Sequence, residues 1–169
     1  MAKTIQQSVT FKAKASKLYA MYADSKTHSA ATGQKASVGA AGGRISAYGG
    51  MISGTMLHTV KNKSIVQTWR AKNWKKSEPD SILILNFEDT KTGGRVSMVH
   101  ANLSDTAAKS VTAGWKSFYW DPWRKYLADA AKPAKKPAKK AAARKKPAAK
   151  KKAPARKKAP ARRTAARRR

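Results

Sequence analysis

The residues best suited to acid–base or metal chemistry in this sequence are three histidines and eight carboxylates, because it contains no cysteine. The lack of cysteine excludes disulfides and thiolate chemistry. The histidines are His28, His58 and His100, and their spacing carries no metal-site pattern. No GxSxG motif marks a serine nucleophile. We therefore predict no catalytic residues, no metal and no cofactor.

The carboxylates fall mostly in turns or at predicted helix ends, where they cap helices or stay solvated. None of them lies on a strand face that we expect to point inward: Asp24, Glu78, Asp80, Glu88, Asp89, Asp105, Asp121 and Asp129. His100 is different, because it alternates with Val96 and Met98 and should share their inward face. A histidine hydrogen-bonded in the core is the preferred interpretation, and a catalytic base is the alternative.

Electrostatics provides the strongest chemical signal in the sequence. Of the formal net charge of +30, residues 131–169 contribute most, since they hold 19 Lys and Arg and no acid. The predicted nucleic-acid-binding residues are Lys132, Lys135, Lys136, Lys139, Lys140, Arg144, Lys145, Lys146, Lys150, Lys151, Lys152, Arg156, Lys157, Lys158, Arg162, Arg163, Arg167, Arg168 and Arg169. Such residues neutralise phosphates and release condensed counterions.

Residues 131–169 are predicted to form a disordered tail. Charges of one sign repel each other, and five prolines interrupt any helix. The segment resembles the lysine-rich ends of linker histones. It offers no base-reading element and no aromatic residue, so we expect non-specific binding to DNA or RNA. A solvating or nuclear-targeting tail is the alternative.

An aromatic stretch, residues 111–127, is the centre of the predicted fold and holds nearly half of the aromatic residues. Trp115, Phe118, Tyr119, Pro122 and Tyr126 follow helical spacing, and a second stripe beside them contains Trp120, Trp123 and Leu127. Pro122 predicts a kink. We expect a helix over residues 106–130, capped by Ser104 or Asp105.

The remaining elements must cover this helix. Alternation and turn residues predict six strands, over residues 4–11, 44–48, 51–60, 64–71, 81–88 and 95–101. Short helices are expected over residues 15–22 and 26–31, the second capped by Asp24 or Ser25 and ended by Gly33. Strands without intervening helices favour an antiparallel sheet. The predicted fold is therefore α+β, a curved antiparallel sheet wrapped around a long C-terminal helix.

Four segments of the sequence also resemble a known family. They are DSKTHSAATG (24–33), GGRISAYGGMISG (42–54), IVQTWRAKNW (65–74) and GWKSFYWDPWRKYL (114–127). In this order they resemble the activator of heat-shock protein 90 ATPase homologue-like domains, members of the START-related SRPBCC superfamily. The resemblance covers residues 1–130 and implies a helix-grip fold with an apolar cavity between helix and sheet.

The cavity implied by the resemblance has ten candidate lining residues. They are Trp69, Leu83, Leu85, Phe87, Val96, Met98, His100, Val111, Trp115 and Tyr119. In any domain, most residues of these types are simply core. The cavity is thus an expectation from the family and not from residue type.

These observations lead to a two-part interpretation: a helix-grip domain, residues 1–130, and a disordered basic tail, residues 131–169. The preferred hypothesis is a non-catalytic domain that binds an apolar small molecule or a protein partner and is anchored to nucleic acid by the tail. One alternative is a regulator of a heat-shock protein 90 ATPase, and another is a cyclase- or hydrolase-like enzyme.

No membrane partner or secretion is expected. The first residues, MAKTIQQSVT, lack the apolar core of a secretory signal. No apolar run approaches the ~20 residues of a membrane helix. We expect a cytoplasmic protein associated with the nucleoid or with chromatin.

Overall fold

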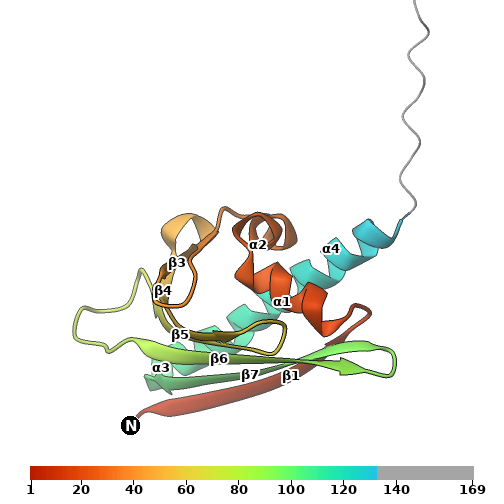
Figure 1. Ribbon diagram of the computed structural model, residues 1–169. Coiled ribbons are helices and arrows are strands. Elements are labelled where there is room, and N and C mark those ends of the chain that lie inside the picture. Colours follow the sequence, from red (N-terminus) through yellow and green to blue (C-terminus); the bar gives the residue numbers. More distant parts are fainter. Residues whose placement is uncertain (133–169) are drawn as a thin grey trace, which may run out of the picture. The chain divides into compact units, whose positions relative to one another are not determined.

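A computed structural model describes residues 1–132 of the chain (Figure 1). The elements in chain order are β1 (Lys3–Phe11), α1 (Ala15–Ala23), α2 (Ser25–Thr32), β2 (Ser37–Val38), β3 (Arg44–Ala47), the 3₁₀ turn η1 (Tyr48–Gly50), β4 (Ile52–Val60), β5 (Ser64–Ala71), β6 (Ser81–Thr90), β7 (Gly93–Leu103), α3 (Asp105–Gly114), the π-helical segment η2 (Trp115–Trp120) and α4 (Asp121–Ala131). This is the predicted α+β fold.

The strands form one antiparallel sheet in the order β1-β7-β6-β5-β4-β3-β2. Alternate residues of β5, β6 and β7 are buried, which is the period-two pattern expected of a sheet covered on one face. Strand β4 comes close to β5 at Gly54, where a Cβ atom would lie 1.9 Å from the Thr68 carbonyl oxygen. Only glycine permits this approach.

The helices cover the buried face of the sheet. Figure 1 shows α1 and α2 above the sheet, with α3 and α4 continuing across it as one long helical run. Gln7 connects this run to β1, because its amide donates to the Thr112 carbonyl at 3.0 Å and accepts from Trp120 Nε1 at 2.5 Å. The sheet and the last helix therefore form a single packed unit.

Helix ends follow the capping residues expected from the sequence. The Asp24 carboxylate accepts from Thr27 N at 2.8 Å, and Gly33 ends α2 with a φ of +70°. Ser104 Oγ caps α3 through the amide of Ala107 at 3.2 Å. Both predicted caps are confirmed.

The long helix differs from the prediction in its middle. Residues Trp115–Trp120 form a π segment, which widens the turn and breaks the assumed 3.6-residue period. As a result the predicted face is wrong in part: Phe118 is 54% exposed, whereas Trp115, Tyr119, Trp120 and Trp123 are buried. The Trp115 and Trp120 rings stack with centroids 5.0 Å apart. The two predicted stripes thus merge into one buried face.

Six strands were expected and seven are present. The additional strand, β2, has two residues and pairs with β3. Val38 N donates to the Ser25 hydroxyl at 2.8 Å, so a side chain of α2 holds β2 in place. No helix among residues 1–132 has the length and apolar character required to cross a bilayer.

Candidate ligand pocket

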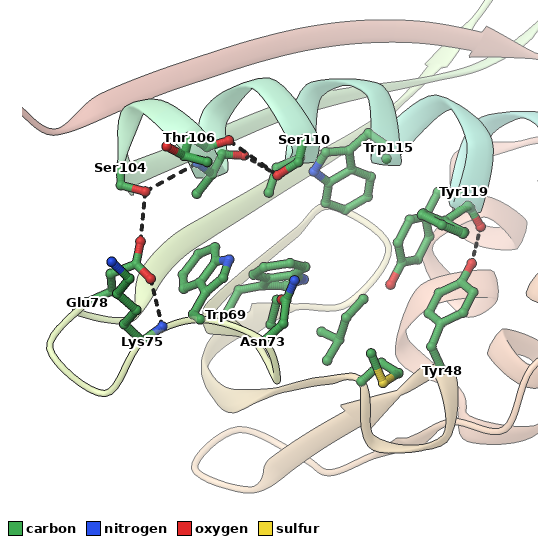
Figure 2. A pocket seen from close by; sticks show the side chains of 18 residues that line it. Tyr48, Trp69, Asn73, Lys75, Glu78, Ser104, Thr106, Ser110, Trp115 and Tyr119 are labelled. Carbon is green, nitrogen blue, oxygen red and sulfur yellow. Dashed lines mark hydrogen bonds between the residues drawn. The ribbon is translucent and has the colours of Figure 1, made fainter.

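A pocket of about 710 Å³ lies between the last helical run and the sheet (Figure 2). The helical wall comes from α3 and η2. The opposite wall comes from η1, the start of β4, the end of β5 and the loop between β5 and β6. The lining residues are Tyr48, Met51, Ile52, Trp69, Ala71, Asn73, Trp74, Lys75, Glu78, Ser104, Thr106, Ala107, Ser110, Val111, Gly114, Trp115, Phe118 and Tyr119.

Aromatic rings form most of the apolar lining. Trp69 lies 5.3 Å from Trp74, measured between ring centroids, and Trp115 lies 4.5 Å from Tyr119. Tyr48 contacts both Tyr119 and Phe118, at 5.7 Å and 5.4 Å. Ring pairs at these separations stabilise one another. The pocket therefore has a wall of mutually packed aromatic rings.

Tyr48 holds one end of the pocket to the helix. Pro122 has no amide hydrogen, so the Phe118 carbonyl, four residues earlier, lacks the donor of a regular α-helix. The Tyr48 hydroxyl donates to that carbonyl instead (Figure 2). Burial raises the pKa of Tyr48 to about 12, which keeps the donor protonated. Its backbone lies in the left-handed region with a φ of 53°, uncommon for a bulky residue.

The other end of the pocket is polar. Ser104 Oγ donates to Glu78 Oε1 at 2.9 Å, and the Lys75 backbone N–H donates to Glu78 Oε2 at 2.8 Å (Figure 2). These hydrogen bonds lower the pKa of Glu78, with the Lys75 amide contributing most. Glu78 therefore stays ionised and fastens the β5–β6 loop to the start of α3.

His100 lies behind the aromatic wall and is completely buried. Trp115 Nε1 donates to His100 Nδ1 at 3.2 Å, so the proton of the neutral ring must be on Nε2. His100 Nε2 lies 2.7 Å from Ser81 Oγ, and the Ser81 hydroxyl donates to the Trp69 carbonyl at 2.7 Å. Burial lowers the pKa of His100 to about 4. The geometry makes it a satisfied core histidine and not a base facing the pocket.

A second cluster of buried polar residues, Tyr22, His28 and Gln67, lies close to Tyr119. The Tyr22 ring is 5.9 Å from Tyr119, and His28 is 5.8 Å from it. His28 Nδ1 lies 2.9 Å from the Tyr22 carbonyl, while His28 Nε2 has no partner among residues 1–132. Tyr22 and Gln67 approach each other without a hydrogen bond of ordinary geometry. Burial raises the pKa of Tyr22 and lowers that of His28, so both stay neutral.

The pocket contains four of the ten predicted lining residues: Trp69, Val111, Trp115 and Tyr119. The other six belong to the buried core of β6 and β7 and do not line the pocket: Leu83, Leu85, Phe87, Val96, Met98 and His100. Their alternation correctly indicated burial. The alternation could not indicate that aromatic rings and the last helix separate these six residues from the pocket.

Sequence reasoning missed the pocket residues on connections. Tyr48 precedes Gly49 and Gly50, and this pair of glycines signals a special turn beside an aromatic residue. Asn73, Lys75 and Glu78 lie on the β5–β6 loop, where no periodic pattern exists. Tertiary contacts bring this loop to the pocket, among them the hydrogen bond between Ser104 and Glu78.

Of the predicted nucleic-acid-binding residues, only Lys132 is described. It follows α4, and its Nζ pairs with Asp129 Oδ1 at 2.7 Å. The other eighteen lie outside the described residues. So does the predicted tail, residues 131–169, except for Ala131 and Lys132. Within residues 1–132, no three His, Asp or Glu side chains gather in a way that could hold a metal ion.

The curved antiparallel sheet, the long C-terminal helix and the pocket between them define a helix-grip domain. The sequence pattern of one family, described as "Activator of Hsp90 ATPase homolog 1-like protein", matches residues 12–128. The chain belongs to this family.

A curated relative is the "Activator of 90 kDa heat shock protein ATPase homolog" of Dictyostelium discoideum. It is 33% identical over 75 residues, which are 44% of this chain and 20% of the relative. The matched part thus spans about a fifth of the relative's length. The likeness therefore concerns only one part of this larger relative.

Solved structures share the fold at low sequence identity. An HSP90 activator from Plasmodium falciparum has a TM-score of 0.65 at 20% identity, over 76% of this chain and 96% of that one. A protein from Mesorhizobium loti has a TM-score of 0.64 at 17% identity, over 75% and 98%. CalU16 from Micromonospora echinospora has a TM-score of 0.61 at 18% identity, over 75% and 76%. These likenesses concern the fold alone.

Proposed function

We propose that this chain regulates the ATPase of a 90 kDa heat-shock protein. The observation that carries the proposal is family membership over residues 12–128, which include all of the sheet except β1 and nearly all of the last helix. The Dictyostelium relative is named for the same activity. Since a likeness at low identity shows only fold, the family match supports the partner class more strongly than the solved structures do.

The test is the rate of ATP hydrolysis by a purified 90 kDa heat-shock protein with and without the full-length chain. The rate that remains when an inhibitor occupies the chaperone's ATP site is subtracted as background. We expect a several-fold rise that saturates and persists at raised ionic strength, which screens non-specific attraction to a chain of net charge +30. An unchanged rate, or a rise that salt abolishes, would contradict the proposal.

A second candidate function is the binding of an apolar small molecule, and the pocket supports it. Its volume of about 710 Å³ falls within the range of small-molecule sites, and its lining combines aromatic rings with a few polar groups. Ligand binding is compatible with the chaperone proposal, because the ligand and the protein partner need not bind to the same surface.

Ser110→Trp tests this second candidate. Ser110 lines the pocket from α3, so an indole there should fill part of the space and weaken binding of an apolar probe such as naphthalene at least tenfold. Lys109→Trp is the matched control, since Lys109 is exposed on the same helix and does not line the pocket. Equal affinities in both variants would argue against binding in this pocket.

We also propose that residues 131–169 anchor the chain to nucleic acid without sequence preference. The support is the sequence alone: 19 cationic residues and no acid.

A further inference from the structure

One end of the sheet carries a cluster of exposed lysines. Three connections meet there: the β1–α1 connection (12–14), the β4–β5 turn (61–63) and the β6–β7 turn (91–92). Figure 1 shows the β6–β7 turn and the β1–α1 connection at the same end of the domain. The lysine cluster consists of the six exposed lysines of these connections and of the first turn of α1: Lys12, Lys14, Lys17, Lys61, Lys63 and Lys91.

Tertiary contacts join the segments that carry the lysine cluster. A Cβ atom at Gly93 would lie 3.1 Å from Lys12 Cα, so the β1–α1 connection adjoins the start of β7 and the turn before it. Residues 15–16 of α1 and residues 61–63 of the β4–β5 turn line one hollow, which connects the start of the helix with that turn. The six lysines therefore belong to one continuous surface.

The acidic residues at this end of the sheet do not neutralise the lysine cluster. The Asp89 carboxylate accepts from Ala15 N at 2.7 Å, and Glu88 pairs with Arg95 at 3.0 Å. Within residues 1–132, none of the six lysines forms an ion pair. Their charges therefore face solvent uncompensated, and such a surface attracts polyanions.

The side chains around the lysine cluster favour duplex nucleic acid over other polyanions. Phe11 and Phe87 are buried, and Tyr19 packs edge-on against Phe87 at 5.5 Å. These rings offer little surface for stacking on bases, which is how single strands are mostly bound. Protein interfaces usually have large apolar or aromatic residues at their centre. The hollow inside the cluster is lined instead by Ala15, Ser16 and other small or polar side chains.

The size and place of the lysine cluster also fit a duplex. It lies at the ends of five neighbouring strands, β1, β7, β6, β5 and β4, which span about 20 Å at the usual spacing between strands. One DNA strand has a phosphate about every 3.4 Å, so this width faces about five or six phosphates. Arg124 of α4 lies 5.3 Å from the centroid of the Phe11 ring. The last helix, after which the basic segment begins, therefore packs against this end of the sheet.

We propose that the lysine cluster binds the phosphate backbone of duplex DNA, without reading its bases, on the same duplex as residues 131–169. This inference rests on the nucleic-acid anchor proposed above and adds a second contact surface, on the domain itself. Six lysines alone bind weakly. Their contribution becomes large when the basic segment keeps the duplex at a high effective concentration.

The test removes the charges of the cluster from the full-length chain and measures binding to a short duplex by fluorescence anisotropy over a series of salt concentrations. The cluster variant combines Lys12→Gln, Lys14→Gln, Lys17→Gln, Lys61→Gln, Lys63→Gln and Lys91→Gln. Each lost phosphate contact makes the slope of log K against log salt shallower by about 0.9, so we expect a slope shallower by about 3 to 5. Lys61→Gln with Lys63→Gln alone should make it shallower by about 1 to 2.

A matched control removes the same charge from other surfaces of the domain. Its six lysines are also exposed and form no ion pair within residues 1–132: Lys26→Gln, Lys35→Gln, Lys72→Gln, Lys76→Gln, Lys109→Gln and Lys116→Gln. Both variants lower the formal net charge by six, so a general effect of charge would act on both equally. We expect the control to keep the slope of the wild type within about one unit. Thermal unfolding verifies that both variants fold.

The outcomes separate this inference from the anchor on which it rests. If the cluster variant and the control bind the duplex with equal slopes, the cluster is not a contact surface. If the wild-type chain does not bind the duplex, the proposed anchor fails together with the inference. Polyglutamate is the second probe. If the cluster variant loses binding to polyglutamate but keeps the wild-type slope on DNA, the partner is an acidic protein segment and the inference is overturned.

Discussion

His100 shows how the surroundings of one residue decide its chemistry. Its position on the inward face of β7 was predictable, because it alternates with Val96 and Met98. Its partners were not, since Ser81 and Trp115 are 19 and 15 residues away in the chain. The tautomer that these partners select leaves no free nitrogen for catalysis. The preferred interpretation from the sequence, a hydrogen-bonded core histidine, is the one that the geometry supports.

Stability should fall as the solution becomes more acidic, because the folded state keeps His100 neutral. The pKa is about 4 in the fold, against an ordinary value near 6.5. Between these values the unfolded chain binds a proton that the folded chain does not, so the free energy of unfolding decreases as pH falls. From pH 7 to pH 5 the loss due to His100 should be about 2 kcal/mol.

Urea unfolding at the two pH values measures this loss. His100→Gln should flatten the pH dependence, since an amide can accept from Trp115 and donate to Ser81 without titrating. His58→Gln is the control, because His58 is exposed on β4. Equal slopes in His100→Gln and the wild type would show that His100 does not cause the effect. A smaller slope should remain in His100→Gln, since burial also lowers the pKa of His28.

At the scale of elements, the last helix depends on an interaction from outside it. Pro122 removes the amide donor that a regular α-helix would give the Phe118 carbonyl, and the Tyr48 hydroxyl of η1 donates to this carbonyl. The sequence predicted a kink in the helix at Pro122, whereas the structure has a π segment just before this proline. Helical periodicity assumes 3.6 residues per turn, so it cannot reveal a widened turn. The strands, in contrast, were predictable to within about two residues, because their alternation is local.

Tyr48→Phe should lower the free energy of unfolding by about 1 kcal/mol, the usual net contribution of one hydrogen bond. In a Pro122→Ala background the same change should have a smaller effect, because an alanine at this position restores an amide hydrogen for the Phe118 carbonyl. Urea unfolding of the wild type, both single variants and the double variant gives the coupling energy. Additive effects would mean that the proline and the tyrosine act independently.

For the whole molecule, charge is distributed very unevenly. Residues 1–130 contain 19 Lys and Arg and all eight acids, whereas residues 131–169 contain 19 Lys and Arg alone. Several acids of the domain are engaged locally, as Glu88 is with Arg95 at 3.0 Å and Asp80 with Arg70 at 3.0 Å. Exposed pairs of this kind add little stability, but they reduce the domain's attraction to polyanions.

The full-length chain should therefore bind duplex DNA of any sequence with a steep salt dependence, and a chain ending at Lys132 should bind weakly. If six to ten phosphates are neutralised, affinity should fall by roughly 10³–10⁵ between about 50 and 200 mM salt. Fluorescence anisotropy with two duplexes of unrelated sequence measures both constants. Similar affinities of the two chains would show that residues 133–169 are not the anchor.

The tryptophan stack gives the protein an optical signature. Trp115 and Trp120 face each other at 5.0 Å and 24°, close enough for their electronic transitions to couple. Such coupling contributes a pair of circular dichroism bands of opposite sign, and removal of either indole removes this contribution. Residues 131–169 contain no aromatic side chain, so the whole signal comes from the domain. The spectrum therefore combines this stacked pair with two other pairs, the tilted Trp69–Trp74 and the edge-on Trp120–Trp123, and replacement of Trp115 by phenylalanine isolates the part that comes from the π segment.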